Sequence, residues 1–91
     1  MTRRMEYMLG RVSATSNALK RLNGRCVSYG LSRHTRYDWG DICKSDWELN
    51  DQALIDGDRI VSVYHDINNE KFYIITEADR SATTILLPED Y

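Results

Sequence analysis

The residues that can do chemistry fall into two polar clusters. The first is the run Asp38-Trp39-Gly40-Asp41, which follows His34 and precedes Asp46 and Trp47. The second is the polar run from Thr76 to Ser81. Carboxylates of this kind can hold a hard cation such as magnesium, a histidine can act as a base, and an arginine can bind an anionic substrate. The residues of the candidate site are His34, Asp38, Trp39, Asp41, Trp47, Glu77, Asp79, Arg80 and Tyr91.

A small enzyme is one hypothesis for these clusters. It uses their histidine, carboxylates and arginine, and it requires residues 34–41 to meet residues 77–81 in space. Turn formation explains the same residues more simply, because Asp and Gly are ordinary turn formers and Asp79 can pair with Arg80. No nuclease, phosphatase or hydrolase motif is present, and the cysteines and histidines lack the close spacing of zinc sites. We therefore predict neither a metal nor a cofactor.

Helices are predicted in the N-terminal part of the chain, ahead of the strands. A short helix over residues 17–22 can be capped by one of three hydroxyls, Ser13, Thr15 or Ser16. The pair Asn23-Gly24 is expected to end this helix in a left-handed conformation.

The sequence predicts little helix over residues 25–36 and a clear helix from Ser45 onward. Residues 25–36 are expected to form a helical turn at most, because Gly30 weakens a helix there. The clearest helix begins at the capping box Ser45-Asp46-Trp47-Glu48 and ends at Gly57. Asn50 is predicted to point toward the core and to make a structural hydrogen bond to a neighbouring loop.

Three strands follow, over residues 59–65, 71–76 and 82–87. They predict an antiparallel meander, because the turn at residues 66–70 contains two asparagines that tolerate left-handed backbone angles. Alternation places Val61 and Val63 on one face, and it places Ile60, Ser62 and Tyr64 on the other. The predicted fold is α+β, with N-terminal helices packed on a three-stranded antiparallel sheet in one domain that spans residues 1–91.

Charge is divided between the two parts of the chain. Residues 1–36 carry eight Lys or Arg against one acid, a net charge of +7, and residues 37–91 carry four against thirteen, a net charge of −9. If the parts pack face to face, these charges cancel internally. If the charges stay apart, one surface attracts nucleic acid and the other a basic protein groove.

Nucleic-acid binding is a further hypothesis, because arginines interleaved with tyrosines suit single strands. The acidic second part of the chain opposes it by repelling phosphate. The candidate residues are Arg3, Arg4, Arg11, Lys20, Arg21, Arg25, Arg33 and Arg36.

Several segments together resemble a family of small bacterial proteins described as plasmid-related. They are the run Asp38-Trp39-Gly40-Asp41, the pair Asn50-Asp51 with Ala53, the strand Arg59-Ile60-Val61-Ser62, and the C-terminal stretch from Ile75 to Tyr91. The resemblance covers roughly residues 9–91. It implies an association with plasmids, integrated elements and phages, and it implies no particular reaction.

The preferred hypothesis is an accessory protein of a mobile element that binds a host protein. Inhibitors of restriction or CRISPR systems fit this description, because an acidic surface can fill a basic groove built for nucleic acid. Trp39, Trp47 and Tyr91 are candidate apolar anchors. The alternatives are the small metal- or carboxylate-dependent enzyme and the nucleic-acid-binding protein.

The remaining expectations concern location and assembly. No signal peptide or membrane-spanning stretch is recognisable, and Cys26 and Cys43 stand apart as reduced thiols do, so a cytoplasmic protein is expected. The exposed edges of a small sheet make a homodimer a further expectation.

Overall fold

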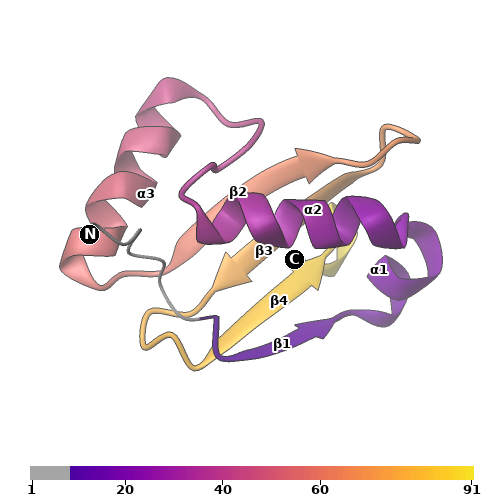
Figure 1. Cartoon of the computed structure of the whole chain (residues 1–91), viewed down its shortest axis with the longest axis horizontal. Helices are drawn as coiled ribbons and strands as arrows, with labels where there is room; N and C mark the ends of the chain where they lie inside the picture. Colours follow the sequence, from indigo (N-terminus) through magenta and orange to yellow (C-terminus); the bar gives the residue numbers. More distant parts are fainter. Residues whose placement is uncertain (1–8) are drawn as a thin grey trace, which may run out of the picture.

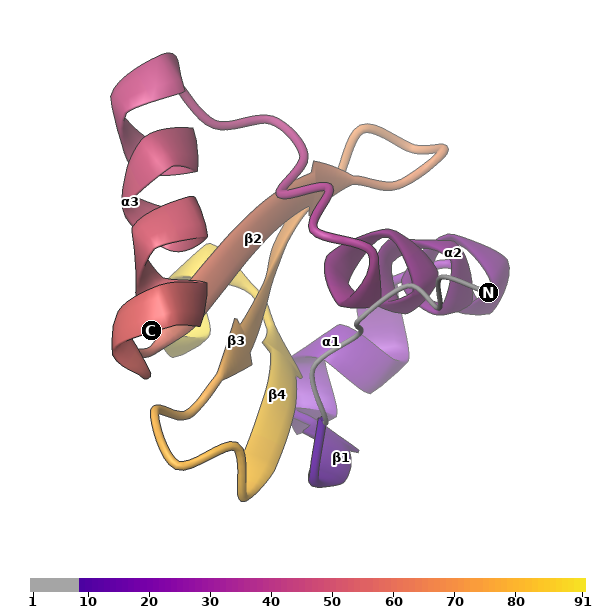
Figure 2. The same cartoon turned by 60° about the vertical axis from the view of Figure 1, so that its left-hand side comes forward.

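One four-stranded mixed sheet with three α-helices forms the α+β fold of the computed structural model, which describes residues 9–91 (Figures 1 and 2). The sheet order is β1-β4-β3-β2. The elements are β1 (Arg11–Ala14), α1 (Ser16–Arg21), α2 (Gly24–Thr35), α3 (Lys44–Asp56), β2 (Ile60–His65), β3 (Lys71–Thr76), β4 (Ala82–Leu86) and the 3-10 helix η1 (Pro88–Asp90).

The predicted meander is present, and one further strand extends it. Strands β2, β3 and β4 pair antiparallel in sequence, whereas β1 adds to the outer side of β4 in parallel. The sequence indicates β1 only weakly, because its alternation of Val12 and Ala14 with polar residues spans just four positions, which are mostly exposed. Strand β1 is held in place by hydrogen bonds at both of its ends. Arg11 N donates to Ser81 O and Thr15 N donates to Ile85 O, each at 3.0 Å.

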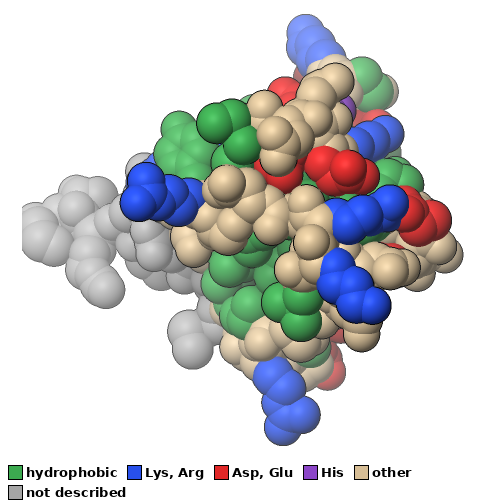
Figure 3. Space-filling model, turned by 90° about the vertical axis from the view of Figure 1, so that its right-hand side faces the viewer, with side chains coloured by type: hydrophobic (Ala, Val, Ile, Leu, Met, Phe, Trp, Pro, Cys, Tyr) green, Lys and Arg blue, Asp and Glu red, His purple; other side chains and the backbone are tan. Residues whose placement is uncertain are grey.

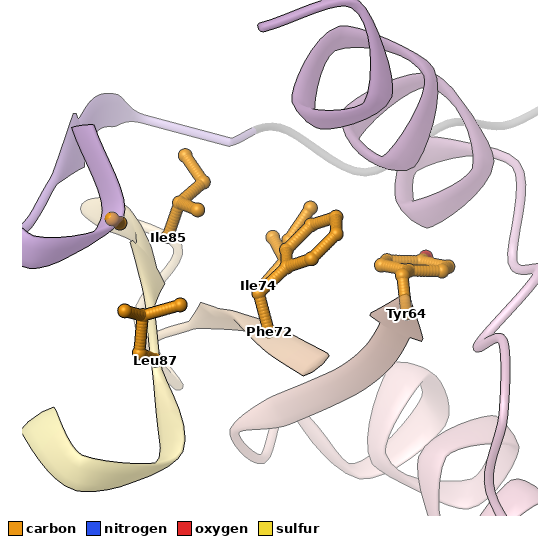
Figure 4. Packing of buried hydrophobic residues seen from close by; sticks show 6 residues of the cluster. Tyr64, Phe72, Ile74, Ile85 and Leu87 are labelled. Carbon is orange, nitrogen blue, oxygen red and sulfur yellow. The ribbon is translucent and has the colours of Figure 1, made fainter. Parts of the chain in front are cut away.

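The face of the sheet under α1 and α2 holds the main core. Ile60, Ser62 and Tyr64 are all buried on this face, which confirms the predicted alternation along β2. Figure 4 shows the apolar side chains of the three strands rising toward the two helices. The buried members of this cluster are Ala18, Tyr64, Phe72, Ile74, Ile85 and Leu87.

The start of α1 agrees with prediction, but its end does not. Thr15 caps α1 by accepting a hydrogen bond from Ala18 N. Asn23 and Gly24 do not form a left-handed stop. Instead Asn23 Oδ1 accepts from the backbone N–H groups of Arg25 and Cys26, so this asparagine caps a second helix that begins at Gly24.

The prediction of one turn at most over residues 25–36 was wrong, since α2 is a helix of twelve residues. Gly30 explains both the error and the structure. A Cβ atom there would lie only 3.2 to 3.3 Å from the side chains of Tyr64, Ile74 and Phe72. The glycine therefore lets α2 lie directly on the core, and this packing outweighs its low helix propensity.

Helix α3 ends where predicted but starts differently. Gly57 ends it in a left-handed conformation, with φ of 76°. The capping box at Ser45 does not form, because the helix starts at Lys44 and Ser45 already lies inside its first turn. The hydroxyl of Ser45 instead contacts Cys43 Sγ at 3.2 Å.

Helix α3 lies along the outer edge of β2, on the opposite side of the sheet from α2 (Figure 2). Ala53 of α3 forms a second core cluster with Trp39 of the preceding loop and Ile60 of β2. The loop before α3 also pairs with β2, because Val63 N donates to Trp39 O at 3.1 Å and Asp41 N donates to Val63 O at 2.7 Å. The loop and α3 thus cover the outer edge of β2. The predicted homodimer would therefore form through the other outer strand of the sheet, β1.

None of the helices formed by residues 9–91 combines the length and the apolar character that crossing a membrane requires.

Candidate functional site

The residues of the proposed enzyme are distributed over two ends of β2. Asp41 Oδ2 lies 2.8 Å from His65 Nδ1, at the far end of that strand, where the carboxylate can accept a hydrogen bond from the ring. Glu77 follows Thr76, which pairs with Ile60 at the other end. These ends are about 16 Å apart at the usual rise of a strand. The structure therefore does not bring the acids of the first cluster to those of the second.

His34 lies in the interior, where it holds the sheet together. Its side chain is fully buried, with Nδ1 hydrogen-bonded to Ser62 Oγ at 2.5 Å and Nε2 to Thr76 Oγ1 at 2.8 Å. Burial, together with the positive charge of Arg80, lowers the pKa of His34 to about 3. The imidazole is consequently neutral at pH 7 and shielded from any substrate in solvent.

The hydrogen bonds of His34 continue across the sheet. Thr76 Oγ1 lies 2.7 Å from Thr83 Oγ1, and the Thr83 hydroxyl donates to Leu9 O at 2.7 Å. Sequence reasoning missed this network. Its available signal was that Ser62, Thr76 and Thr83 occupy inward-facing positions of otherwise apolar strands.

Asp38 supports the corner between α2 and the following loop. Its carboxylate accepts two hydrogen bonds from the guanidinium of Arg33, at 2.8 and 3.2 Å, and one from Gly40 N. The hydrogen bond from Arg33 is the main reason that the pKa of Asp38 is lowered. The hydroxyl of Tyr64 also donates to Asp38 O at 2.7 Å.

The two tryptophans face the core. Trp39 is fully buried, and its Nε1 donates to Asp51 Oδ1 at 2.9 Å. Trp47 is half-buried against the same cluster. Tyr91 alone among the three predicted anchors has a largely exposed side chain, at 65%.

The turn between β3 and β4 is tied to the end of α3. Arg80 has a left-handed backbone, with φ of 63°. Its Nη1 donates to the carbonyl oxygens of Glu77 and Ala78 in the same turn. It also reaches the end of α3, where Nη1 donates to Asp58 O and Nη2 donates to Ala53 O. The guanidinium therefore places a positive charge at the last turn of α3, where a cation is favourable. Asp79 accepts from Ser81, which lowers the pKa of Asp79.

A groove of about 560 Å³ opens on the face of the sheet away from α1 and α2. Its floor consists of Val61, Val63 and Tyr73, which alternate with the buried residues of the other face. Leu49 of α3 and Tyr91 at the C-terminus line its sides.

The rim of this groove carries most of its charge. Asp41 and Asp46 contribute carboxylates, and Lys71 contributes one ammonium group. Tyr91 is held in place by Arg59, whose Nη2 donates to the phenol oxygen at 2.8 Å, and by Tyr73, whose ring centroid is 5.5 Å away. Two predicted site residues, Asp41 and Tyr91, thus meet in one groove.

A smaller, apolar hollow of about 140 Å³ lies at the other side of the molecule. It is formed between α1, α2 and β4, mainly by Ala18, Leu19, Leu22 and Val27. Figure 3 shows the end of the molecule that contains α1. Hydrophobic side chains lie at the centre of this view, with Lys and Arg side chains around them.

The charges of the two parts of the chain remain largely apart. Among residues 9–91, two ion pairs join a Lys or Arg of the first part to an acid of the second: Arg21 with Glu89, and Arg33 with Asp38. Four basic residues of the first part make no ion pair within the described range: Arg11, Lys20, Arg25 and Arg36. Arg3 and Arg4 lie outside the described residues.

The described residues contain no cluster of metal ligands. Within residues 9–91, no three His, Cys, Asp or Glu side chains come together in a way that could hold a metal ion.

No family model matches the sequence, and neither a curated protein nor a solved structure shows significant similarity to it.

Proposed function

We propose that this protein acts by binding another protein in the groove between α3 and the open face of the sheet. The groove itself carries the proposal, because it combines an apolar floor with exposed apolar side chains. Leu49 is 67% exposed and Tyr91 is 65% exposed. Exposed apolar side chains rimmed by polar ones are typical of protein interaction sites.

The rim indicates the chemistry of the partner. Asp41 and Asp46 border the groove, and α3 as a whole carries four carboxylates against one lysine. These charges favour a partner segment in which an apolar side chain stands next to Lys or Arg. Lys71, which also lines the groove, would orient that segment by attracting an acidic group.

The resemblance to plasmid-related proteins indicates where the partner is found. We propose a cytoplasmic protein of a bacterial host as the occupant of the groove. A basic surface built to hold nucleic acid has the required charge. An inhibitor of a restriction or CRISPR system would use the groove in this way.

Two variants of α3 test the proposal. The tagged protein is purified from its bacterial host after nuclease treatment, and the bound proteins are identified by mass spectrometry. Leu49→Asp places a charge inside the groove and should abolish capture of the partner. Ile55→Asp is the matched control, because Ile55 is a 79% exposed residue of the same helix outside the groove.

The proposal requires one protein that is retained by the wild type and by Ile55→Asp at equal yield and is lost with Leu49→Asp. Circular dichroism must show that both variants remain folded. Equal capture by all three forms, or loss with both variants, would contradict binding in the groove.

A further inference from the structure

We infer that the outer face of α2 binds single-stranded nucleic acid, as a second binding surface opposite the groove. Figure 2 shows α2 on one side of the sheet and α3 on the other, along the edge of β2. A strand bound along α2 would therefore leave the groove accessible. The inference stands independently of the proposed protein partner.

The outer face of α2 carries the types of side chain that bind phosphate. Arg25, Ser28 and Tyr29 of α2 are exposed, as is Arg36, which caps its C-terminal end, and Ser32 is half-buried. Their spacing places them on the helix face opposite Gly30 and His34, which are buried against the sheet. Arginine, serine and tyrosine side chains are common donors to phosphate oxygens.

Negative charge is sparse around this face. The Asp66 carboxylate accepts from Asn23 N at the start of α2, at 3.1 Å, but Asp66 is buried. No Asp or Glu occurs between Glu6 and Asp38. Asp38 itself is engaged by Arg33, so its carboxylate is neutralised where it approaches the helix. Lys20 on neighbouring α1 adds an exposed cation that makes no ion pair within residues 9–91. Together these charges form a surface that attracts a polyanion.

Tyr29 favours a single strand over a duplex. Its ring is 62% exposed in the middle of the cationic face. The guanidinium of Arg33 lies 5.6 Å from the centre of this ring, and it lies 4.8 Å from the centre of the Tyr64 ring in the core. This stacking supports the ring, which can receive an unpaired base. Alternating cations and an aromatic platform are what single strands require.

The test is fluorescence anisotropy with a labelled single-stranded oligonucleotide, with duplex DNA of the same sequence as competitor. At low ionic strength we expect binding whose log K falls with log salt at a slope of about −2, as for three phosphate contacts. Tyr29→Ala should weaken binding about fivefold or more, whereas Tyr29→Phe should remain within about twofold of the wild type.

Charge is tested by the double variant Arg25→Gln/Arg36→Gln, which should weaken binding at low salt by at least about tenfold and flatten the salt dependence. Lys44→Gln at the start of α3 is the control, because it removes one positive charge from the opposite side. Arg33 is left intact, since its pair with Asp38 supports the fold.

Three results would overturn the inference: no binding at low ionic strength, wild-type affinity in the double variant, or a duplex that competes as well as the single strand. Failure here is separable from failure of the protein-binding proposal. Leu49→Asp should bind the oligonucleotide like the wild type.

Discussion

Asn50 binds the backbone of Val61 through both ends of its side-chain amide. Its Nδ2 donates to Val61 O at 2.7 Å, and its Oδ1 accepts from Val61 N at 3.2 Å. The side chain thus occupies the place of a neighbouring strand along the edge of β2. A group that pairs in both directions closes this edge against association with other chains.

Asn50→Ala should therefore destabilise the fold. Asn50 is buried, and its loss would leave both polar groups of Val61 unpaired. We expect the free energy of unfolding to fall by about 2 to 4 kcal/mol. Urea denaturation measures the change, with Gln52→Ala as control because Gln52 is exposed on the same helix. A loss below about 0.5 kcal/mol would show that the edge does not depend on Asn50.

Two glycines should respond in opposite ways to replacement by alanine. Gly40 has φ of 81°, and a Cβ atom there would lie 2.0 Å from Val63 O. Gly40→Ala should lower stability by about 2 kcal/mol or more. Gly24 begins α2 and a Cβ atom there meets nothing within 4 Å, so Gly24→Ala should raise stability by up to about 1 kcal/mol. Thermal unfolding of the two variants would contradict this account if the melting temperatures moved together.

The stability of the protein should depend on pH through His34. Because folding lowers the pKa of His34 from about 6.5 to about 3, the folded state favours the neutral ring. This contribution is complete above about pH 6.5 and is lost as the pH falls toward about 3. We expect a loss of about 2 to 3 kcal/mol between about pH 6.5 and about pH 4.5.

Urea unfolding across this pH range tests the assignment. His34→Gln should be less stable than the wild type at neutral pH, since it loses hydrogen bonds, but its stability should change less with pH. His65→Gln is the control, because it removes the other histidine of the chain and leaves His34 intact. An unchanged slope in His34→Gln would place the titration elsewhere.

Replacing single carboxylates by amides should show which of them contribute to the stability of the fold. Asp38→Asn breaks the pair with Arg33, and we expect a stability loss of up to about 1 kcal/mol for this half-exposed pair. Glu77→Gln should change stability by less than about 0.5 kcal/mol, because its side chain is exposed. A larger loss for Glu77→Gln than for Asp38→Asn would reverse this assignment.

The sequence predicted the elements whose signals are local. Alternation along β2, the turn between β2 and β3, and the left-handed Gly57 each depend on a few neighbouring residues. Helix α2 and strand β1 could not be predicted in this way. Gly30 opposes a helix until the side chains of the sheet are in place. The alternation in β1 covers only four residues, which is too short to predict a strand before it pairs with β4.

The candidate site was harder to predict than the fold. Polar residues close in sequence separated in space, since His34 turned inward, Asp38 joined Arg33 and Arg80 joined the end of α3. The groove joins residues that are far apart along the chain, such as Leu49 and Tyr91. Their proximity depends on the packing of α3 against β2.

Hydrogen–deuterium exchange of the complex with the captured host protein tests the central proposal most directly. We predict increased protection of backbone amides in α3 around Asp46 to Asn50, in the facing parts of β2 and β3, and near Tyr91. The exchange of α2 should be unchanged. Protection confined to α2, with no change around the groove, would contradict the account.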